Sequence, residues 1–297
     1  RDPVLPKAAA AGDTERCIGE WLSQSGKRSE ITLATKVAGR ADTRPDWKHI
    51  RGGPRLSRDH IRQAIEGSLE RLQTDYVDLY QVHWPERATN FFGMRGYVHY
   101  PQADGIAIEE TLDALSELVD EGLVKHVGLS NETPWGLMEY LRLASERGMA
   151  KVVSIQNVYN LLSRQFETGL AEMAIREEVG LLAYSPMAFG VLSGKYLNGQ
   201  KPAGSRLELF ERFARYGSPQ SEAATIAYKE IADNHGMTLA QMSLAFVCQQ
   251  PFVTSCLIGA TTMDQLRENI DAVEIELSKE LCAEIDAVHN QYPDPAP

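Results

Sequence analysis

Six short apolar runs alternate with amphipathic stretches along this sequence of 297 residues, and this alternation constrains the fold more than any other feature. The apolar runs have the length and composition of buried strands. They read ITLATKV, YVDLYQVHW, KHVGLSN, VVSIQN, GLLAYSPM and TSCLIGA, at residues 31–37, 76–84, 125–131, 152–157, 180–187 and 254–260. Buried strands that are separated by helices pair in parallel through helical crossovers, so the sequence predicts an α/β fold.

The stretches between the runs carry apolar residues at helical spacing. Within residues 57–73, for example, Ile61 and Ile65 repeat at this spacing behind Ser57, a typical N-cap residue. Helices are predicted at residues 14–24, 57–73, 108–122, 134–148, 169–178, 222–236, 239–250, 261–273 and 278–290. The last of them closes the chain as an extra helix.

Chemically unusual residues gather at the carboxyl ends of the predicted strands. They are Lys36, His83, Ser130, Asn131, Gln156, Asn157, Tyr184, Ser185 and Gly259. Alternation alone leaves open a doubly wound sheet and a closed (β/α)8 barrel. The barrel is favoured, because barrel enzymes build their sites at this end and because the GxGxxG fingerprint of the rival fold is missing from the sequence. We therefore expect a single TIM barrel domain over residues 1–297.

The strand count falls short of such a barrel. Eight strands are needed and six are predicted, with the helix at residues 14–24 unpaired before the first strand. A barrel of ~250 residues uses ~30 residues for each strand and helix, so two strands and the helix between them would take roughly 45 to 50 residues. On this count we expect that the chain is truncated at its N-terminus and that the first two strands are missing.

Charge and cysteine content exclude several classes of function. The formal net charge of −11 argues against a general nucleic-acid binder, because phosphate contacts need clustered Lys and Arg. The cysteines Cys17, Cys248, Cys256 and Cys282 lack CxxC spacing, so neither a disulfide framework nor a zinc site is indicated. Reduced thiols in a cytoplasmic protein are expected. No run approaches the ~18 apolar residues of a membrane span, and the oligomeric state is not readable from the sequence.

Lys36 and His83 are the residues that most suggest catalysis. Each has an ordinary explanation when it is taken alone: a lysine that reaches from a strand end to water, and a histidine with a structural hydrogen bond. At the same end of neighbouring strands, however, the two side chains form a candidate catalytic pair.

Several separated motifs, in matching order, resemble the aldo-keto reductases over essentially the whole chain, and within them the Tas-like reductases and the β subunits of voltage-gated potassium channels. The motifs are TLATKV, DYVDLYQVHWP, GLSNE, IQNVYN, AYSPMAFGVLSGKY and LIGATTMDQLRENI. The resemblance implies a (β/α)8 barrel that binds NADP(H) across its C-terminal mouth and passes a hydride to an aldehyde or ketone. It matches Lys36 and His83 to the family's catalytic lysine and histidine.

The resemblance also implies a cofactor site. Ser130, Asn131 and Gln156 match the groups that hold the nicotinamide amide, which needs both donors and acceptors. Tyr184 matches the aromatic residue that stacks on the nicotinamide ring. The remaining matches are a pyrophosphate loop, with Ser185, Met187, Gly190, Leu192, Gly194 and Lys195, and an adenosine phosphate segment, with Gly259, Thr261, Gln265, Glu268 and Asn269.

The start of the helix at residues 261–273 belongs to this implied site. The helix is expected to begin at Thr261 or Thr262, so that free backbone N–H groups face a phosphate. A Thr-capped helix without a ligand is the alternative. Gln265 stands where the superfamily often has arginine, with Arg267 nearby, so the preference for NADP over NAD is left open.

A carbonyl pocket is expected beside His83. Trp84 is predicted to form part of its wall. The long loop at residues 87–104, which contains Phe91, Phe92, Tyr97 and Tyr100, is interpreted as a substrate-pocket loop, with a packed structural loop as the alternative.

Half of the family's catalytic tetrad has no counterpart in the sequence. In the family an aspartate and a tyrosine come from a D-x-A-x-x-Y segment, and no such segment is present. An ungapped match through DPVLP places Asp2 at the tyrosine position, where a carboxylate of ordinary pKa near ~3.9 could not donate a proton at neutral pH. Two hypotheses follow: an NADPH-dependent reductase, and a catalytically weak or inactive NADP(H)-binding interaction module.

Overall fold

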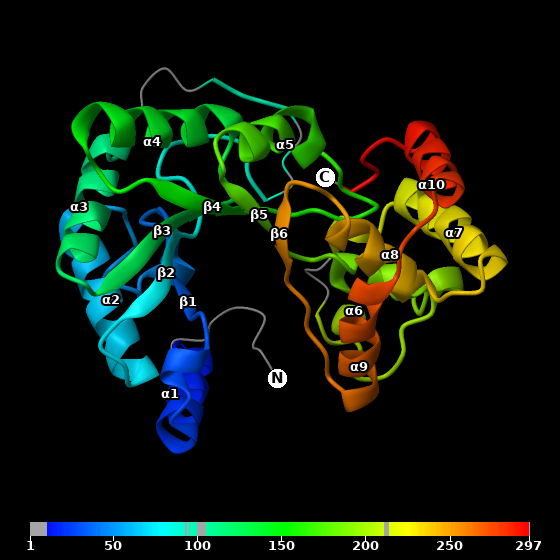
Figure 1. The fold of residues 1–297 in the computed structure, drawn as a ribbon, viewed down its shortest axis with the longest axis horizontal. Coiled ribbons are helices and arrows are strands. Elements are labelled where there is room, and N and C mark those ends of the chain that lie inside the picture. The colour runs from blue at the N-terminus through cyan, green and yellow to red at the C-terminus, as the bar shows by residue number, and fades with distance from the viewer. Residues whose placement is uncertain (1–10, 93, 95, 100–104, 211–213, 297) are drawn as a thin grey trace. The chain divides into compact units, whose positions relative to one another are not determined.

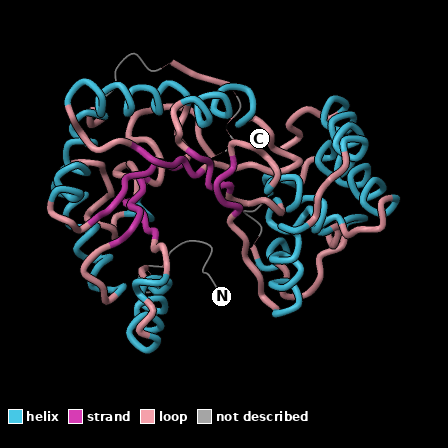
Figure 2. Tube along the Cα trace, viewed as in Figure 1, coloured by secondary structure: helices cyan, strands magenta, loops and turns pink. Residues whose placement is uncertain are grey.

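The computed structural model describes residues 11–92, 94, 96–99, 105–210 and 214–296. The chain divides into two compact units, Arg1–Phe91 with Gly96–Ile155, and Phe92–Arg95 with Gln156–Pro297. Helices and strands alternate along the chain in the first unit, whereas among the described residues of the second unit several helices follow one another without a strand between them. Figure 2 colours the helices and strands.

The strands of the first unit pair in parallel and in chain order. β1 (Ala34–Val37) pairs with β2 (Val77–Val82), and β2 pairs with β3 (Val124–Ser130). β4 (Val152–Gln156) comes next in the sheet order. Because these strands run in one direction, their carboxyl ends lie at one edge of the sheet.

The described part of the first unit has four helices, of which the first precedes β1 and the other three connect successive strands (Figure 1). They are α1 (Asp13–Ser25), α2 (Arg58–Leu72), α3 (Ile108–Asp120) and α4 (Pro134–Arg147). Ser57 caps α2 as the sequence predicts, because its side chain accepts a hydrogen bond from the N–H group of His60. The apolar stripes of α2 and α3 form the core of this unit, with Ile61, Ile65, Leu72, Leu112, Leu115 and Leu118 fully buried.

In the second unit β5 (Gly180–Ala183) pairs in parallel with β6 (Val253–Cys256). The helices of this unit are α5 (Phe166–Arg176), α6 (Arg206–Leu209), α7 (Pro219–Asn234), α8 (Leu239–Cys248), α9 (Met263–Asp271) and α10 (Lys279–Gln291). Nearly all residues of α8 are buried, and Tyr159 packs its ring against Phe246 of this helix at 6.0 Å between centroids. α8 is therefore the central helix of the second unit's core.

The predicted α/β class is confirmed. Each predicted strand and helix is present with small shifts at its ends, and only the short helix α6 and several 3-10 turns were not predicted. Six strands are found in the described part of the chain, so the two further strands expected for a complete barrel are not among these residues. Within the same part, no helix combines the length and the apolar character needed to cross a membrane.

Candidate active site

Lys36 and His83 lie side by side at the carboxyl ends of β1 and β2. Lys36 is the last but one residue of β1 and is paired in register with Gln81. His83 directly follows β2, and its backbone N–H donates to the carbonyl oxygen of Val37 at 3.0 Å. The parallel ladder thus holds both residues at one edge, as the sequence predicts.

Burial sets the charge state of this pair. Burial, followed by the positive charge of Lys36, lowers the pKa of His83 to about 3. Burial also lowers the pKa of Lys36 below its usual range. A neutral imidazole therefore faces the edge of the sheet at neutral pH, where it can donate or accept a hydrogen bond but carries no charge.

The lowered pKa of His83 predicts a loss of stability in acid. Between about pH 6.5 and about pH 3, the unfolded chain binds a proton on this imidazole and the native chain does not. Because of His83, the free energy of unfolding therefore falls by up to about 1.4 kcal/mol for each pH unit below about pH 6.5, and above that pH His83 causes no such loss.

Urea unfolding at pH 7 and pH 5 measures this contribution. The His83→Gln variant should lose less stability between the two pH values than the unchanged chain, by about 2 kcal/mol. The control is His126→Gln, because His126 is an exposed residue of β3. An equal loss of stability in the His83→Gln variant and the unchanged chain would contradict a buried neutral His83.

Asn131 and Ser130 support His83 from the end of β3. The Nδ2 group of Asn131 donates to the carbonyl oxygen of His83 at 2.9 Å and to the hydroxyl oxygen of Ser130 at 3.1 Å. Asn131 has a φ of 54°, in the left-handed region that asparagine tolerates better than most residues. The sequence assigns these two side chains to the nicotinamide amide, and the structure adds a contact with the backbone of the candidate catalytic histidine.

The indole ring of Trp84 packs against the imidazole ring of His83. The two ring centroids are 4.8 Å apart, and the indole Nε1 of Trp84 donates to the carbonyl oxygen of Arg40 at 2.9 Å. The side chain is only 5% exposed. Gly39 makes this packing feasible, since a Cβ there would lie 2.6 Å from Cδ1 of Trp84. Trp84 thus fixes the position of His83, and its role in a carbonyl pocket stays a prediction.

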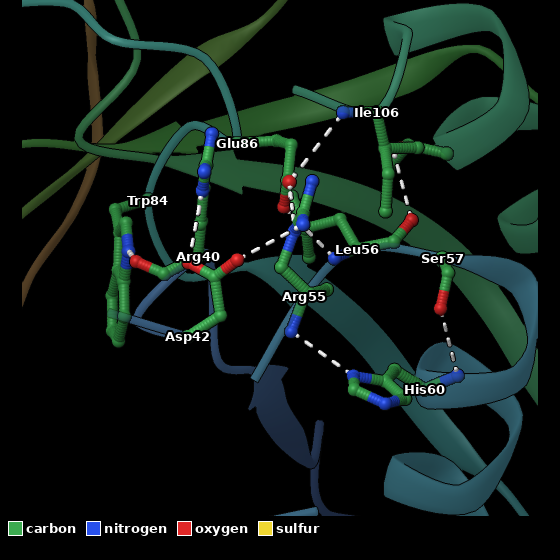
Figure 3. Close-up of polar contacts among 10 residues, drawn as sticks. Arg40, Asp42, Arg55, Leu56, Ser57, His60, Trp84, Glu86 and Ile106 are labelled. Carbon is green, nitrogen blue, oxygen red and sulfur yellow. Dashed lines mark hydrogen bonds and ion pairs between the residues drawn. The ribbon is translucent and has the colours of Figure 1, made fainter. Parts of the chain in front are cut away.

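A cluster of charged side chains, with Glu86 buried and the others partly buried, lies beside Trp84 (Figure 3). Glu86, whose side chain is 4% exposed, accepts hydrogen bonds from Arg55 Nε and from the backbone N–H groups of Leu56, at 3.0 Å, and Ile106, at 3.4 Å. Arg55 also donates to Asp42 at 3.0 Å. Glu86 therefore ties two separate segments, at residues 55–56 and at Ile106, to the residues that follow β2.

Arg40 extends this cluster toward the indole ring. Its Nε donates to Asp42 at 3.0 Å, and its carbonyl oxygen accepts the bond from Trp84. Sequence analysis missed these residues. The available signal was Glu86 itself, a carboxylate three residues after His83 and next to a buried strand.

A second buried carboxylate lies beyond β3. Glu132 is paired with the guanidinium of Arg87 through two N–H groups, and it accepts the backbone N–H of Thr133 at 2.6 Å. Gly136 leaves room for this pair, because a Cβ at this position would collide with the Glu132 carboxylate at 2.2 Å. The first residue of the predicted substrate-pocket loop, Arg87, is thereby anchored to the start of α4.

The rest of that loop is only partly described. Phe92 and Tyr97 are 44% and 62% exposed, and Tyr100 lies outside the described residues. The interpretation of residues 87–104 as a substrate-pocket loop stays a prediction.

In the second unit, the residues predicted to contact the nicotinamide lie at strand ends. Gln156 is the last residue of β4, and Tyr184 directly follows β5. The backbone N–H of Tyr184 donates to the carbonyl oxygen of Asn157 at 3.1 Å. Burial raises the pKa of the Tyr184 phenol, against the smaller opposing effect of Arg215. The ring is thus held by its backbone, with its hydroxyl in the neutral form.

The predicted pyrophosphate loop is a tight turn. The 3-10 element η4 (Ala188–Ser193) contains left-handed φ values of 58° at Phe189 and 93° at Gly190. The backbone N–H of Gly190 donates to the carbonyl oxygen of Met187 at 2.7 Å. Lys195 folds back over Gly190, where a Cβ would lie 3.2 Å from the lysine Nζ. The turn therefore brings one ammonium group against exposed backbone, an arrangement that suits an anionic group.

The other predicted members of this loop take different positions in the turn. Leu192 is fully buried, so the residue is not accessible to a ligand in this arrangement. Gly194 has a left-handed φ of 76° and ends the turn. Ser185 accepts hydrogen bonds at its carbonyl oxygen from Asn160 Nδ2, at 2.9 Å, and from the N–H of Ala188, at 2.9 Å.

The predicted adenosine phosphate segment forms the start of α9. Thr262 is the N-cap, which confirms the second of the two predicted helix starts. The side chain of Gln265 accepts the backbone N–H of Thr261 at 3.0 Å, and Asn269 Nδ2 donates to the carbonyl oxygen of Gly259 at 3.4 Å. A phosphate bound at Thr261 would replace Gln265 as the acceptor.

Glu268 points away from this helix start. Its carboxylate accepts a hydrogen bond from the hydroxyl of Thr238 at 2.7 Å, and Thr238 is the N-cap of α8. Glu268 therefore links α9 to α8. The structure thus brings together Lys36, His83, Trp84, Ser130 and Asn131 in the first unit, and the assignment of two phosphate-binding segments in the second unit stays a prediction.

Comparison with known proteins gives one family. The model of the aldo/keto reductase family matches residues 10–290. The protein named Protein tas of Escherichia coli (strain K12) is 51% identical over 295 residues, which cover 99% of this chain and 85% of that protein.

Two relatives of lower sequence identity have other names. An aldo-keto reductase of Babesia bovis is 38% identical over 284 residues, or 90% of this chain and 98% of that protein. A probable voltage-gated potassium channel subunit beta of Arabidopsis thaliana is 31% identical over 276 residues, or 90% of this chain and 75% of that protein.

Proposed function

The chain belongs to the aldo/keto reductase family, and from this premise we propose that it is an NADP(H)-dependent oxidoreductase that reduces aldehydes or ketones to alcohols. Family membership supports an oxidoreductase role in general. The observation that carries the finer proposal is the pair formed by neutral His83 and buried Lys36 at the carboxyl ends of β1 and β2.

His83 and Lys36 have complementary tasks under this proposal. A neutral imidazole can donate one N–H group to the oxygen of a carbonyl substrate and so polarise the carbonyl bond. The ammonium group of Lys36 can stabilise negative charge that develops on the same oxygen. NADPH, when bound, supplies the hydride.

The proposed cofactor residues fit an anionic dinucleotide. Ser130, Asn131 and Gln156 offer both donors and acceptors to a carboxamide. Lys195 supplies positive charge above the backbone of Gly190, which suits a pyrophosphate. These residues would bind and orient the nucleotide, and Tyr184 would support the face of its nicotinamide ring.

Two experiments test the proposal. Fluorescence titration of the chain with NADPH and with NADH measures binding and nucleotide preference. A panel of aldehydes and ketones, followed at the NADPH absorbance band, measures turnover. The resemblance implies that the proton comes from a tyrosine in a D-x-A-x-x-Y segment, which these residues do not contain, so the turnover assay tests directly whether this chain reduces a carbonyl.

The outcomes separate the two hypotheses. Binding with NADPH oxidation by a member of the panel supports the reductase. Tight NADPH binding without oxidation by any aldehyde or ketone favours the catalytically weak or inactive interaction module. Failure to bind either nucleotide overturns both.

Tyr184 provides a specific test of the nucleotide site. The Tyr184→Ala variant should bind NADPH about tenfold more weakly, because stacking on an aromatic ring contributes about 1–3 kcal/mol. The matched control is Tyr184→Phe, which keeps the ring and should bind almost normally. Unchanged binding in the alanine variant would assign Tyr184 to the core instead.

A further inference from the structure

Asn160 is an asparagine of the second unit whose side chain contacts the predicted pyrophosphate loop. The residue is fully buried. Its Nδ2 group donates to the carbonyl oxygen of Ser185 at 2.9 Å and to the hydroxyl oxygen of Tyr216 at 3.1 Å. Its Oδ1 atom accepts the backbone N–H of Leu162 at 2.9 Å. The amide nitrogen thus has two acceptors and the amide oxygen has a donor, which satisfies a buried side-chain amide.

The backbone that carries this side chain is itself held in place. Asn160 begins a tight turn, in which its N–H donates to the carbonyl oxygen of Ser163 at 3.1 Å and its carbonyl oxygen accepts the N–H of Ser163 at 3.0 Å. The same turn is bonded to the end of the described chain, because the N–H of Ala296 donates to the carbonyl oxygen of Leu162 at 3.1 Å. The amide of Asn160 therefore projects from a turn that does not depend on the pyrophosphate loop for its shape.

The segment that Asn160 contacts has an unfavourable backbone conformation. Ser185, Ala188 and Phe189 have φ values of 54°, 47° and 58°, in the left-handed region, where a Cβ atom is crowded. The N–H of Ala188 donates to the carbonyl oxygen of Ser185 at 2.9 Å within this segment. Non-glycine residues keep such φ values only where their surroundings enforce them. Residues 185–189 are called the strained segment below.

We propose that Asn160 is a positioning residue that holds the strained segment in its left-handed conformation before a nucleotide binds. Asn160 acts at both ends of the segment. It bonds directly to the carbonyl oxygen of Ser185, and it bonds to Tyr216, whose ring packs edge-on against Phe189 with 5.0 Å between centroids.

The expected ligand, NADP(H), is taken from the proposed function, so this part of the inference rests on that proposal. A loop that already has its binding conformation spares the nucleotide the free energy of ordering it. The apparent Kd is the intrinsic Kd divided by the fraction of molecules in the binding conformation. Asn160 therefore raises the affinity for the nucleotide without touching it.

Hydrogen–deuterium exchange of the nucleotide-free protein tests whether the segment is held. In the unchanged chain, peptides that cover residues 185–190 should exchange much more slowly than an unstructured peptide of the same sequence, because the N–H groups of Ala188 and Gly190 are bonded within the turn. In Asn160→Ala their exchange should be about tenfold faster, while peptides from α8 change little. The first measurement needs no variant, so it does not depend on how a substitution affects folding.

A titration with NADPH tests the consequence for binding. Asn160→Ala should raise the Kd for NADPH about tenfold, because fewer molecules hold the loop in the binding conformation. The matched control is Tyr216→Phe. This variant removes the other acceptor of the same amide but keeps the bond from Asn160 to Ser185 and the ring against Phe189, so its Kd should change little.

A second substitution separates positioning from general stability. Glycine adopts a left-handed φ without the crowding of a Cβ atom. Adding Ala188→Gly to Asn160→Ala should therefore restore part of the affinity for NADPH, although it removes a buried methyl group. If Asn160 only stabilised the fold, this second change would weaken binding further.

Four results would overturn the proposal. They are exchange at the rate of the unstructured peptide in the unchanged chain, equal acceleration of residues 185–190 and of α8 in Asn160→Ala, an unchanged Kd in that variant, and a double variant that binds no more tightly than Asn160→Ala. Failure of the unchanged chain to bind NADPH or NADH is a different result. It overturns the proposed function, and the exchange measurements still decide whether Asn160 holds the strained segment.

Discussion

Replacing Glu86 with alanine should lower the free energy of unfolding by about 3 kcal/mol, because the substitution removes one of the carboxylates that a partly buried guanidinium binds and the acceptor of two backbone N–H groups. The guanidinium belongs to Arg55, and the N–H groups belong to Leu56 and Ile106. Glu86→Gln keeps one acceptor oxygen and should lose less stability. Urea unfolding at pH 7, with the transition followed by circular dichroism, measures both changes.

The control for this prediction is an ion pair on the surface. Glu121 is paired with Arg62 in water, so Glu121→Ala should leave the free energy of unfolding close to that of the unchanged chain. A Glu86→Ala variant that is as stable as the control would contradict the cluster around Glu86, and with it the account of how Trp84 is held against His83.

The second large effect concerns the reaction itself. His83→Ala should lower the rate of carbonyl reduction on the order of a hundredfold or more, because a positioned hydrogen-bond donor to the carbonyl oxygen is lost. The affinity for NADPH should change little. Asn131 donates to the backbone carbonyl oxygen of His83, so the substitution leaves that contact in place.

Single-turnover kinetics and a nucleotide titration on one preparation separate the two effects. A large loss of NADPH affinity in His83→Ala, with a normal rate at saturating nucleotide, would mean that His83 supports the cofactor site instead. Trp84→Phe serves as a comparison, because it removes the indole bond to Arg40 while the imidazole remains. Its rate should lie between those of His83→Ala and the unchanged protein.

The alternation of apolar runs was enough to predict the fold. Period and length identify buried strands and amphipathic helices locally, and parallel pairing follows from the helices between them. The meeting of Lys36 and His83 was predictable for the same reason. Residues at the carboxyl ends of neighbouring parallel strands lie at the same edge of the sheet, independently of the rest of the fold.

The supports of the site were not predictable in this way. Glu86 finds its partners at Arg55, Leu56 and Ile106, up to 31 residues away along the chain, and no local pattern signals such pairs. The contact of Trp84 with Gly39 likewise depends on the path of the backbone. Charge clusters of this kind can therefore be identified only from the three-dimensional structure.

The backbone conformation of the predicted pyrophosphate loop could not be predicted from the sequence either. Gly190 is a residue from which a left-handed φ can be expected, but Ala188 and Phe189 also adopt left-handed φ values of 47° and 58°. Neither residue type signals this conformation.

Deuterium transfer from C4-deuterated NADPH tests the central claim most directly. The protein is incubated with the labelled nucleotide and the carbonyl panel, and the alcohols are analysed by mass spectrometry. An NADP(H)-dependent carbonyl reductase places one deuterium on the carbon that bears the new hydroxyl group. Saturation with the labelled nucleotide without deuterium in any alcohol would contradict the account.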